Sequence, residues 1–117
     1  MRAIFLVVVL LSSAPAAFAA GWSGTGAELE TLCTGQESSF DAGACAGYVL
    51  SIADIMRDTA KGGALVGNEA CFPTDVRVGQ MVDALLKFLK QHSESRRYSA
   101  WSLTARAFAE AFPCGRK

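Results

Sequence analysis

Residues 41–63 read DAGACAGYVLSIADIMRDTAKGG, and this stretch decides the fold class. Its apolar side chains recur at steps of three and four residues, a spacing that places them on one face of an α-helix. They are Cys45, Tyr48, Val49, Ile52, Ile55 and Met56. Asp41 is a favoured N-cap residue, and the Gly62-Gly63 pair marks the end of the pattern. The stretch therefore predicts one long amphipathic helix that buries a single face.

A short helix is expected before this stretch. Thr25 and Glu28 form a Thr-x-x-Glu capping box, in which each side chain satisfies a free amide at a helix start. Leu29 and Leu32 then share one face, and Gly35 is a typical helix stop. The sequence therefore predicts a helix between Thr25 and Gly35.

Two more helices are expected after the long one. The third begins after Pro73 with Thr74 as its N-cap, and the fourth ends at Pro113. The apolar face of the third consists of Val78, Met81, Val82, Leu85, Leu86, Phe88 and Leu89. That of the fourth consists of Tyr98, Trp101, Ala105, Phe108 and Phe112, which we interpret as core residues. No segment alternates at period two, so the fold class is all-α, a small four-helix domain.

The first nineteen residues have the layout of a secretory signal peptide. Arg2 supplies a positive start, residues 3–11 are an unbroken apolar run, and Ala17-Phe18-Ala19 is a small-x-small cleavage site. The alternative is a membrane anchor, but the run is only about nine residues long, whereas a spanning helix needs roughly 20. We expect residues 1–19 to be a cleaved signal peptide and residues 20–117 to form one secreted domain.

The four cysteines then meet an oxidising compartment, where two structural disulfides are expected. Cys33 and Cys45 lie at the facing ends of the first two helices. If the loop after the second helix runs back along it, Cys71 returns to Cys45 and Cys114 comes near Cys33. We favour this pairing, Cys45–Cys71 with Cys33–Cys114. The alternative, Cys33–Cys45 with Cys71–Cys114, needs a loop that stays at the far end of the second helix.

The residues of common catalytic and metal sites are missing. His92 is the sole histidine and lies in a polar turn, so no histidine-based triad or metal cluster is expected. Asp54 and Asp58, one turn apart, are interpreted as a solvated face. Signal cleavage removes only Arg2 among the charged residues and shifts the formal charge from 0 to about −1, which argues against nucleic-acid or anionic-lipid partners. We expect no enzyme, no metal and no cofactor.

The sequence around the cysteines and helix ends resembles the Rap1a/Tai family of immunity proteins. The matching motifs are Cys45-Ala-Gly-Tyr48-Val49 continuing to Asp54, Cys71-Phe-Pro73, Gln80-x-Val82 with Phe88-Leu89 and His92, and Ala100 and Phe108 with the closing Phe112-Pro113-Cys114. The resemblance implies a small periplasmic protein of Gram-negative bacteria that binds and inhibits a peptidoglycan amidase effector of type VI secretion.

A second resemblance leads to a different function. The helical arrangement is similar to that of the HdeA-type acid-stress chaperones, in which a disulfide joins the starts of two helices. That analogy also favours Cys45–Cys71. The alternative to an immunity protein is therefore a periplasmic helical protein with a structural or stress-related role and no toxin partner.

The surface that would meet a protein partner is our own inference from the loops. An inhibitor of a cleft needs a protruding, mobile element, and two loops qualify, residues 62–70 and 91–97. The second offers His92, Glu94, Arg96 and Arg97, which could engage the Cys/His cleft of an amidase. The alternative is that both loops are solvated connections. A homodimer through the third or fourth helix is also possible, because a stripe in the core and a stripe at an interface have the same periodicity.

Overall fold

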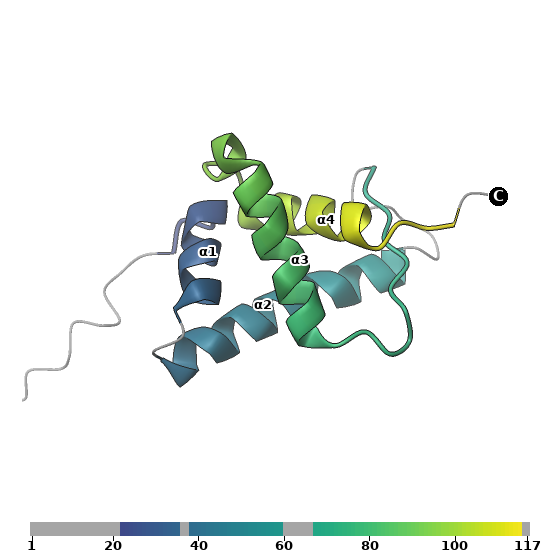
Figure 1. Cartoon of the computed structure of the whole chain (residues 1–117), viewed down its shortest axis with the longest axis horizontal. Coiled ribbons are helices and arrows are strands. Elements are labelled where there is room, and N and C mark those ends of the chain that lie inside the picture. Colours follow the sequence, from purple (N-terminus) through teal and green to yellow (C-terminus); the bar gives the residue numbers. More distant parts are fainter. Residues whose placement is uncertain (1–21, 36–37, 60–66, 116–117) are drawn as a thin grey trace, which may run out of the picture.

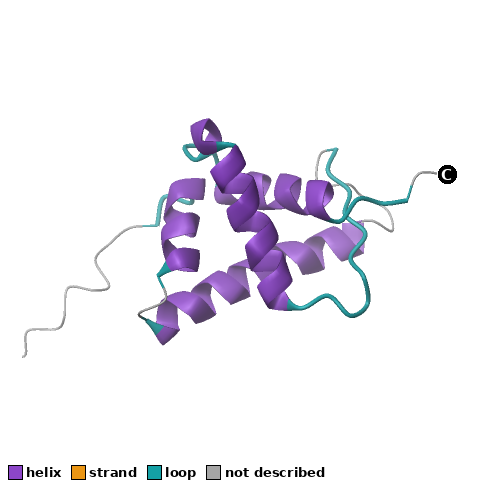
Figure 2. Cartoon of the chain, in the orientation of Figure 1, coloured by secondary structure: helices purple, strands orange, loops and turns teal. Residues whose placement is uncertain are grey.

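The computed structural model describes residues 22–35, 38–59 and 67–115 of the chain, without the side chain of residue 59. Four α-helices follow one another, with a short 3-10 turn between the last two (Figure 1). They are α1 (Gly26–Thr34), α2 (Ser39–Thr59), α3 (Val78–Gln91), η2 (Ser93–Ser95) and α4 (Ala100–Ala111). An isolated β-bridge pairs Thr25 with Ser99, the described residues contain no β-strand, and Figure 2 accordingly shows helices joined by loops. The all-α prediction is confirmed, whereas the predicted signal peptide lies outside the described residues.

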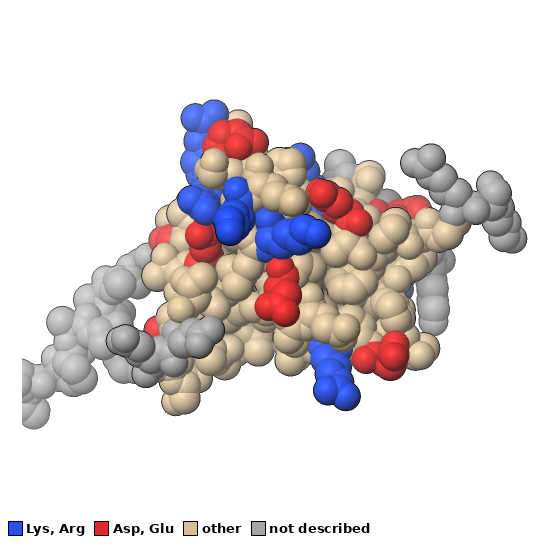
Figure 3. All heavy atoms as spheres, in the orientation of Figure 1, with Lys and Arg blue, Asp and Glu red and all other residues tan. Residues whose placement is uncertain are grey.

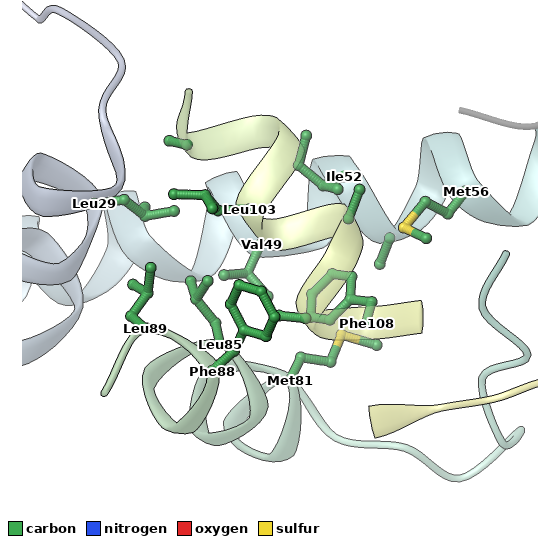
Figure 4. Close-up of a cluster of buried hydrophobic side chains, with 14 of the residues drawn as sticks. Leu29, Val49, Ile52, Met56, Met81, Leu85, Phe88, Leu89, Leu103 and Phe108 are labelled. Carbon is green, nitrogen blue, oxygen red and sulfur yellow. The ribbon is translucent and has the colours of Figure 1, made fainter. Parts of the chain in front are cut away.

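The helices enclose one core, to which each of them contributes. Helix α2 is the longest, α1 packs against its first half, and α3 runs across both α2 and α4 and contacts each of them (Figure 1). Figure 4 shows Leu29 of α1, Val49 of α2, Leu85 of α3 and Phe108 of α4 pointing toward one another. All four side chains are fully buried. The apolar periodicity therefore identified at least one core residue in every helix.

Some stripe residues lie outside the core. Tyr98 and Trp101 keep 51% and 43% of their surface exposed, and Ile55 keeps 45%. The prediction that the whole aromatic stripe of the fourth helix packs in the core is therefore wrong for Tyr98 and Trp101. Helix α4 starts only at Ala100, so Tyr98 precedes it, and its buried face is formed by Ala100, Leu103, Thr104, Ala105, Ala107 and Phe108.

Two of the three predicted helix starts are displaced. The capping box at α1 is present as predicted, with Thr25 Oγ1 accepting from the Glu28 amide at 3.3 Å. Helix α2, however, already begins at Ser39, and the Asp41 amide donates to Ser38 Oγ at 3.4 Å, so Asp41 lies in the first turn instead of capping it. Helix α3 begins four residues after Thr74, because residues 73–76 form a turn of their own.

The disulfides join Cys33 to Cys45 and Cys71 to Cys114, with Cα–Cα distances of 5.0 and 4.8 Å. The favoured pairing, Cys45–Cys71 with Cys33–Cys114, is therefore wrong, although the HdeA analogy had also favoured Cys45–Cys71, and the alternative pairing is the one present. Cys71 lies near the far end of α2, because its neighbour Phe72 lies under the Arg57 guanidinium, and the Cys71 amide donates to the Phe112 carbonyl at 2.8 Å. The chain returns toward the start of α2 only afterwards, along residues 72–77 (Figure 1).

Candidate partner-binding loop

Residues 92–99 connect α3 to α4 at one end of the molecule, and we call this connection the loop (Figure 1). The loop begins at His92, whose amide donates to the Phe88 carbonyl and so closes the last turn of α3. The His92 ring packs on Phe88 with 4.3 Å between the ring centroids. Its two nitrogens lie 3.8 Å from a Glu94 oxygen and 3.9 Å from a Glu110 oxygen. His92 is thus held between two carboxylates and a core phenyl ring, not freely solvated as its polar neighbours suggested.

The backbone of the loop caps α1. The first amides of a helix have no partner within it, and those of Gly26 and Ala27 donate to the carbonyls of Tyr98 and Arg96, both at 2.9 Å. The Ala100 amide in turn donates to the Gly24 carbonyl at 2.6 Å. These long-range bonds fix the loop against the start of α1. The predicted mobility of the 91–97 loop is therefore not what the structure shows.

Gly26 makes this close approach possible. A Cβ atom at this position would collide with Cδ1 of Leu103 and would lie 3.2 Å from the Arg96 carbonyl oxygen. Leu103 is buried, and the carbonyl belongs to the backbone, so neither can give way freely. A residue without a side chain is therefore required where α1 meets the loop.

Arg96 is occupied within the fold. Its Nε lies 2.6 Å from Glu30 Oε2 of α1. Both atoms are shielded from solvent, and the contact is an ion pair, not a well-aligned hydrogen bond. This ion pair makes Arg96 a structural link between the loop and α1, and it leaves less of the guanidinium for a partner.

Three charged or aromatic side chains of the loop face solvent instead: Glu94, Arg97 and Tyr98. Arg97 donates to the Tyr98 hydroxyl at 3.3 Å, and its guanidinium lies over the Tyr98 ring. That hydrogen bond raises the pKa of Arg97, so the group stays cationic. Sequence reasoning missed Tyr98 because it fits the apolar stripe of α4. Ser99 was the signal that could have found it, since serine is a favoured N-cap residue and Ser99 is the residue that directly precedes α4.

The four predicted contact residues do lie together on the loop, although they differ in role. Glu94 and Arg97 are exposed, His92 is partly covered, and Arg96 is paired with α1. Figure 3 shows Lys and Arg gathered over the loop and the C-terminal half of α3, where Lys87 and Lys90 are exposed. Of the other candidate loop, residues 62–66 lie outside the described residues.

The described residues contain no cluster of three or more His, Cys, Asp or Glu side chains that could hold a metal ion. Within the same ranges, no helix combines the length and the apolar character that a membrane span requires.

Fold and loop together define a small all-α domain that is closed by two disulfides and presents a fixed, charged loop. The family model of Rap1a immunity proteins matches residues 25–114, a range that contains all four helices and both disulfides. The chain therefore belongs to the family of Rap1a immunity proteins. In the same comparisons, no curated protein and no solved structure matches the chain.

Proposed function

We propose that this protein is a periplasmic immunity protein that binds and inhibits a peptidoglycan amidase effector delivered by type VI secretion. The observation that carries the proposal is the match to the Rap1a immunity proteins over residues 25–114. An immunity protein acts by binding its effector, so the proposal requires a protein partner and no catalytic group in this chain. The signal peptide predicted over residues 1–19 would deliver the chain to the compartment where such an amidase acts.

The loop supplies the contact in this proposal. Arginine and tyrosine dominate the binding energy of many protein interfaces, and here Arg97 and Tyr98 lie stacked and exposed next to each other. Because hydrogen bonds to α1 already fix the loop backbone, little conformational entropy is lost on binding. A cation held at this position would attract the thiolate of a Cys/His amidase cleft. The loop would thus block the cleft as a preformed plug.

The test is a binding and inhibition measurement with the purified amidase effector of the same bacterium. We expect the mature, oxidised protein to form a stoichiometric complex and abolish hydrolysis of peptidoglycan. Arg97→Ala should weaken the complex by about 2 kcal/mol, roughly 30-fold, if Arg97 is a central contact. Arg57→Ala at the other end of the molecule is the matched control and should bind like wild type.

An alternative role has a distinct outcome in this measurement. A folded, oxidised protein that neither binds nor inhibits the amidase would point to the structural or stress-related periplasmic role. The molecular mass of the free protein in solution, measured by light scattering, would show in the same experiments whether it forms the homodimer that the helical stripes allow.

A further inference from the structure

A hollow of about 410 Å³ lies at the opposite end of α3 from the loop. Helices α1, α2 and α3 line it together with the Cys33–Cys45 disulfide. The residues on α3 are Val78, Gly79, Val82 and Asp83, and we call the feature the α3 hollow. Val78 leaves 37% of its surface exposed there, an unusual amount for a residue on the apolar face of its helix. The α3 hollow is thus a mainly apolar depression that the described part of the chain leaves open.

The charged side chain that lines the α3 hollow is acidic. Asp83 lines it and is exposed, and it forms no ion pair with any residue that the structure describes. Asp41 lies nearby, since its Oδ2 is 3.2 Å from the position that a Cβ on the lining residue Gly35 would take. No lysine or arginine is among the lining residues. An apolar hollow with acidic groups attracts an apolar group that is followed by a cation.

The backbone at the start of α3 is accessible as well. A Cβ added to Gly79 would meet no atom within 4 Å, so another chain can approach closely here. The amides of Val78 and Gly79 are the first two of the helix, and no carbonyl of the described residues accepts from them. A peptide carbonyl is the natural acceptor for such amides. The hollow therefore suits a polypeptide better than a free small molecule.

We infer, on the basis of the proposed function, that the α3 hollow is a second docking site that takes an apolar side chain followed by lysine or arginine from the effector. Exposed residues of α3 lead from it toward the loop: Gly79, Asp83, Lys87 and Lys90. Helix α3 has 14 residues and is about 21 Å long. One interface of ordinary size, about 800 Å² on each partner, can therefore cover both sites.

The main test fills the α3 hollow without harming the fold. Gly79→Gln places a side chain at its rim, and because Gly79 is helical and open, the change should not destabilise α3. Gly47→Gln on α2 is the matched control, since Gly47 is equally open and does not line the hollow. We expect Gly79→Gln to weaken the amidase complex at least tenfold and Gly47→Gln to leave it unchanged. Equal affinity of the two variants would overturn the inference.

The charge is tested separately. Asp83→Lys should weaken the same complex at least tenfold, whereas Asp58→Lys, an equally exposed reversal on α2, should have no such effect. If both reversals act alike, the effect is one of net charge, and Asp83 is not a specific contact. That result would also overturn the inference.

A probe that does not depend on the effector separates this inference from the proposed function. N-acetyl-Leu-Arg-N-methylamide, titrated into the isotope-labelled mature protein, should shift the amide resonances of Gly79, Val82 and Asp83. N-acetyl-Leu-Glu-N-methylamide should shift them at least threefold less. Absent shifts, or equal shifts with both peptides, would overturn the docking site whether or not the amidase binds.

A second copy of this chain is the alternative molecule that could occupy the α3 hollow. If the wild-type protein sediments as a dimer and Gly79→Gln as a monomer, the hollow is a self-interface and the inference is wrong. If the wild-type protein fails to bind the amidase, the proposed function is wrong, and the peptide titration alone tests whether the α3 hollow is a docking site. If the wild-type protein binds and Gly79→Gln binds equally well, the inference about the α3 hollow is wrong and the proposed function is retained.

Discussion

Gly26 shows at the residue scale how one position couples two distant parts of the chain. It opens α1, and the absence of a side chain lets the loop carbonyls of Arg96 and Tyr98 accept from the first amides of that helix. The neighbouring capping box then satisfies the next amide. The conformation of the candidate binding loop therefore depends on the start of α1, and the start of α1 depends on the loop.

Gly26→Ala is expected to destabilise the protein by about 1–3 kcal/mol, the usual cost of overpacking a close contact. The added methyl group would press on Leu103 and the Arg96 carbonyl. Gly47→Ala is the control, because its surroundings are open and alanine is favoured in a helix. Chemical denaturation of both variants measures the difference, and an unchanged Gly26→Ala variant would contradict the coupling.

Glu28 makes the stability of the protein depend on pH. Hydrogen bonds from Ser23 and from the Thr25 amide lower the pKa of Glu28 to about 2, below its usual value of 4.5. A carboxyl group with a lowered pKa in the folded state stabilises the fold above pH 4.5, and this contribution is lost as the pH falls toward 2. Glu28→Gln should therefore lower the melting temperature at pH 7 and have little effect at pH 2. Glu69→Gln, on the exposed segment before Cys71, is the control, and an equal effect of Glu28→Gln at both pH values would argue against this role.

At the scale of elements, the loop between α3 and α4 is a rigid part of the fold that also presents charges. Arg96 faces inward to Glu30, while Glu94 and Arg97 face outward. Replacing all the charges of the loop at once would therefore mix an effect on folding with an effect on binding. The two outward residues are the proper positions for a binding test.

Arg96→Ala should cost about 1 kcal/mol of stability, because it leaves the shielded Glu30 Oε2 atom without its partner. Glu30→Gln combined with Arg96→Ala should recover part of this loss, since no unpaired charge then remains. Thermal denaturation of the two single variants and the double variant gives the coupling between the residues. Strictly additive losses would show that the ion pair does not hold the loop.

The helices and the loop differ in how far they could be predicted. The stripes of α2 and α3 follow from period alone, because a buried face of a helix must repeat every three to four residues. The start of α4 could not be read in that way, since Tyr98 fits the stripe although it lies outside the helix. The spacing of apolar residues also could not show that Arg96 pairs with Glu30, because that contact depends on how two elements distant in sequence pack against each other.

On the scale of the whole molecule, the two disulfides close opposite ends of the helical bundle. Cys33–Cys45 joins the end of α1 to the start of α2, and Cys71–Cys114 joins the segment after α2 to the end of α4. The pairing was not predictable from helix order, because it depends on which way the glycine-containing connection after α2 runs. Beside the second disulfide, Phe72 packs its ring against Phe108 and Phe112.

The pairing can be read directly from a digest of the oxidised protein. Trypsin should release residues 62–77 linked to residues 107–116, because the cleavage sites around Cys71 and Cys114 separate them from each other and from the other cysteines. Cys33 and Cys45 should remain within one peptide that ends at Arg57. Mass spectrometry of a mixed species, with the 62–77 peptide joined to the peptide that contains Cys45, would contradict the structure.

Removing the Cys71–Cys114 disulfide, which closes the longer of the two covalent loops, should destabilise the whole fold. The Cys71–Cys114 bond spans 43 residues, and the chain-entropy argument assigns such a bond about 4 kcal/mol. We expect Cys71→Ala combined with Cys114→Ala to lose about that amount in urea denaturation. A loss below about 1 kcal/mol would mean that packing, including that of Phe72, holds this end without the bond.

The most direct measurement is a protection assay in the periplasm of a bacterial host that produces the amidase effector there. The account predicts that co-production of this protein prevents lysis, that Arg97→Ala reduces the protection and that Arg57→Ala retains it. Lysis that proceeds unchanged in the presence of folded, oxidised wild-type protein would contradict the central claim that the protein neutralises an amidase effector.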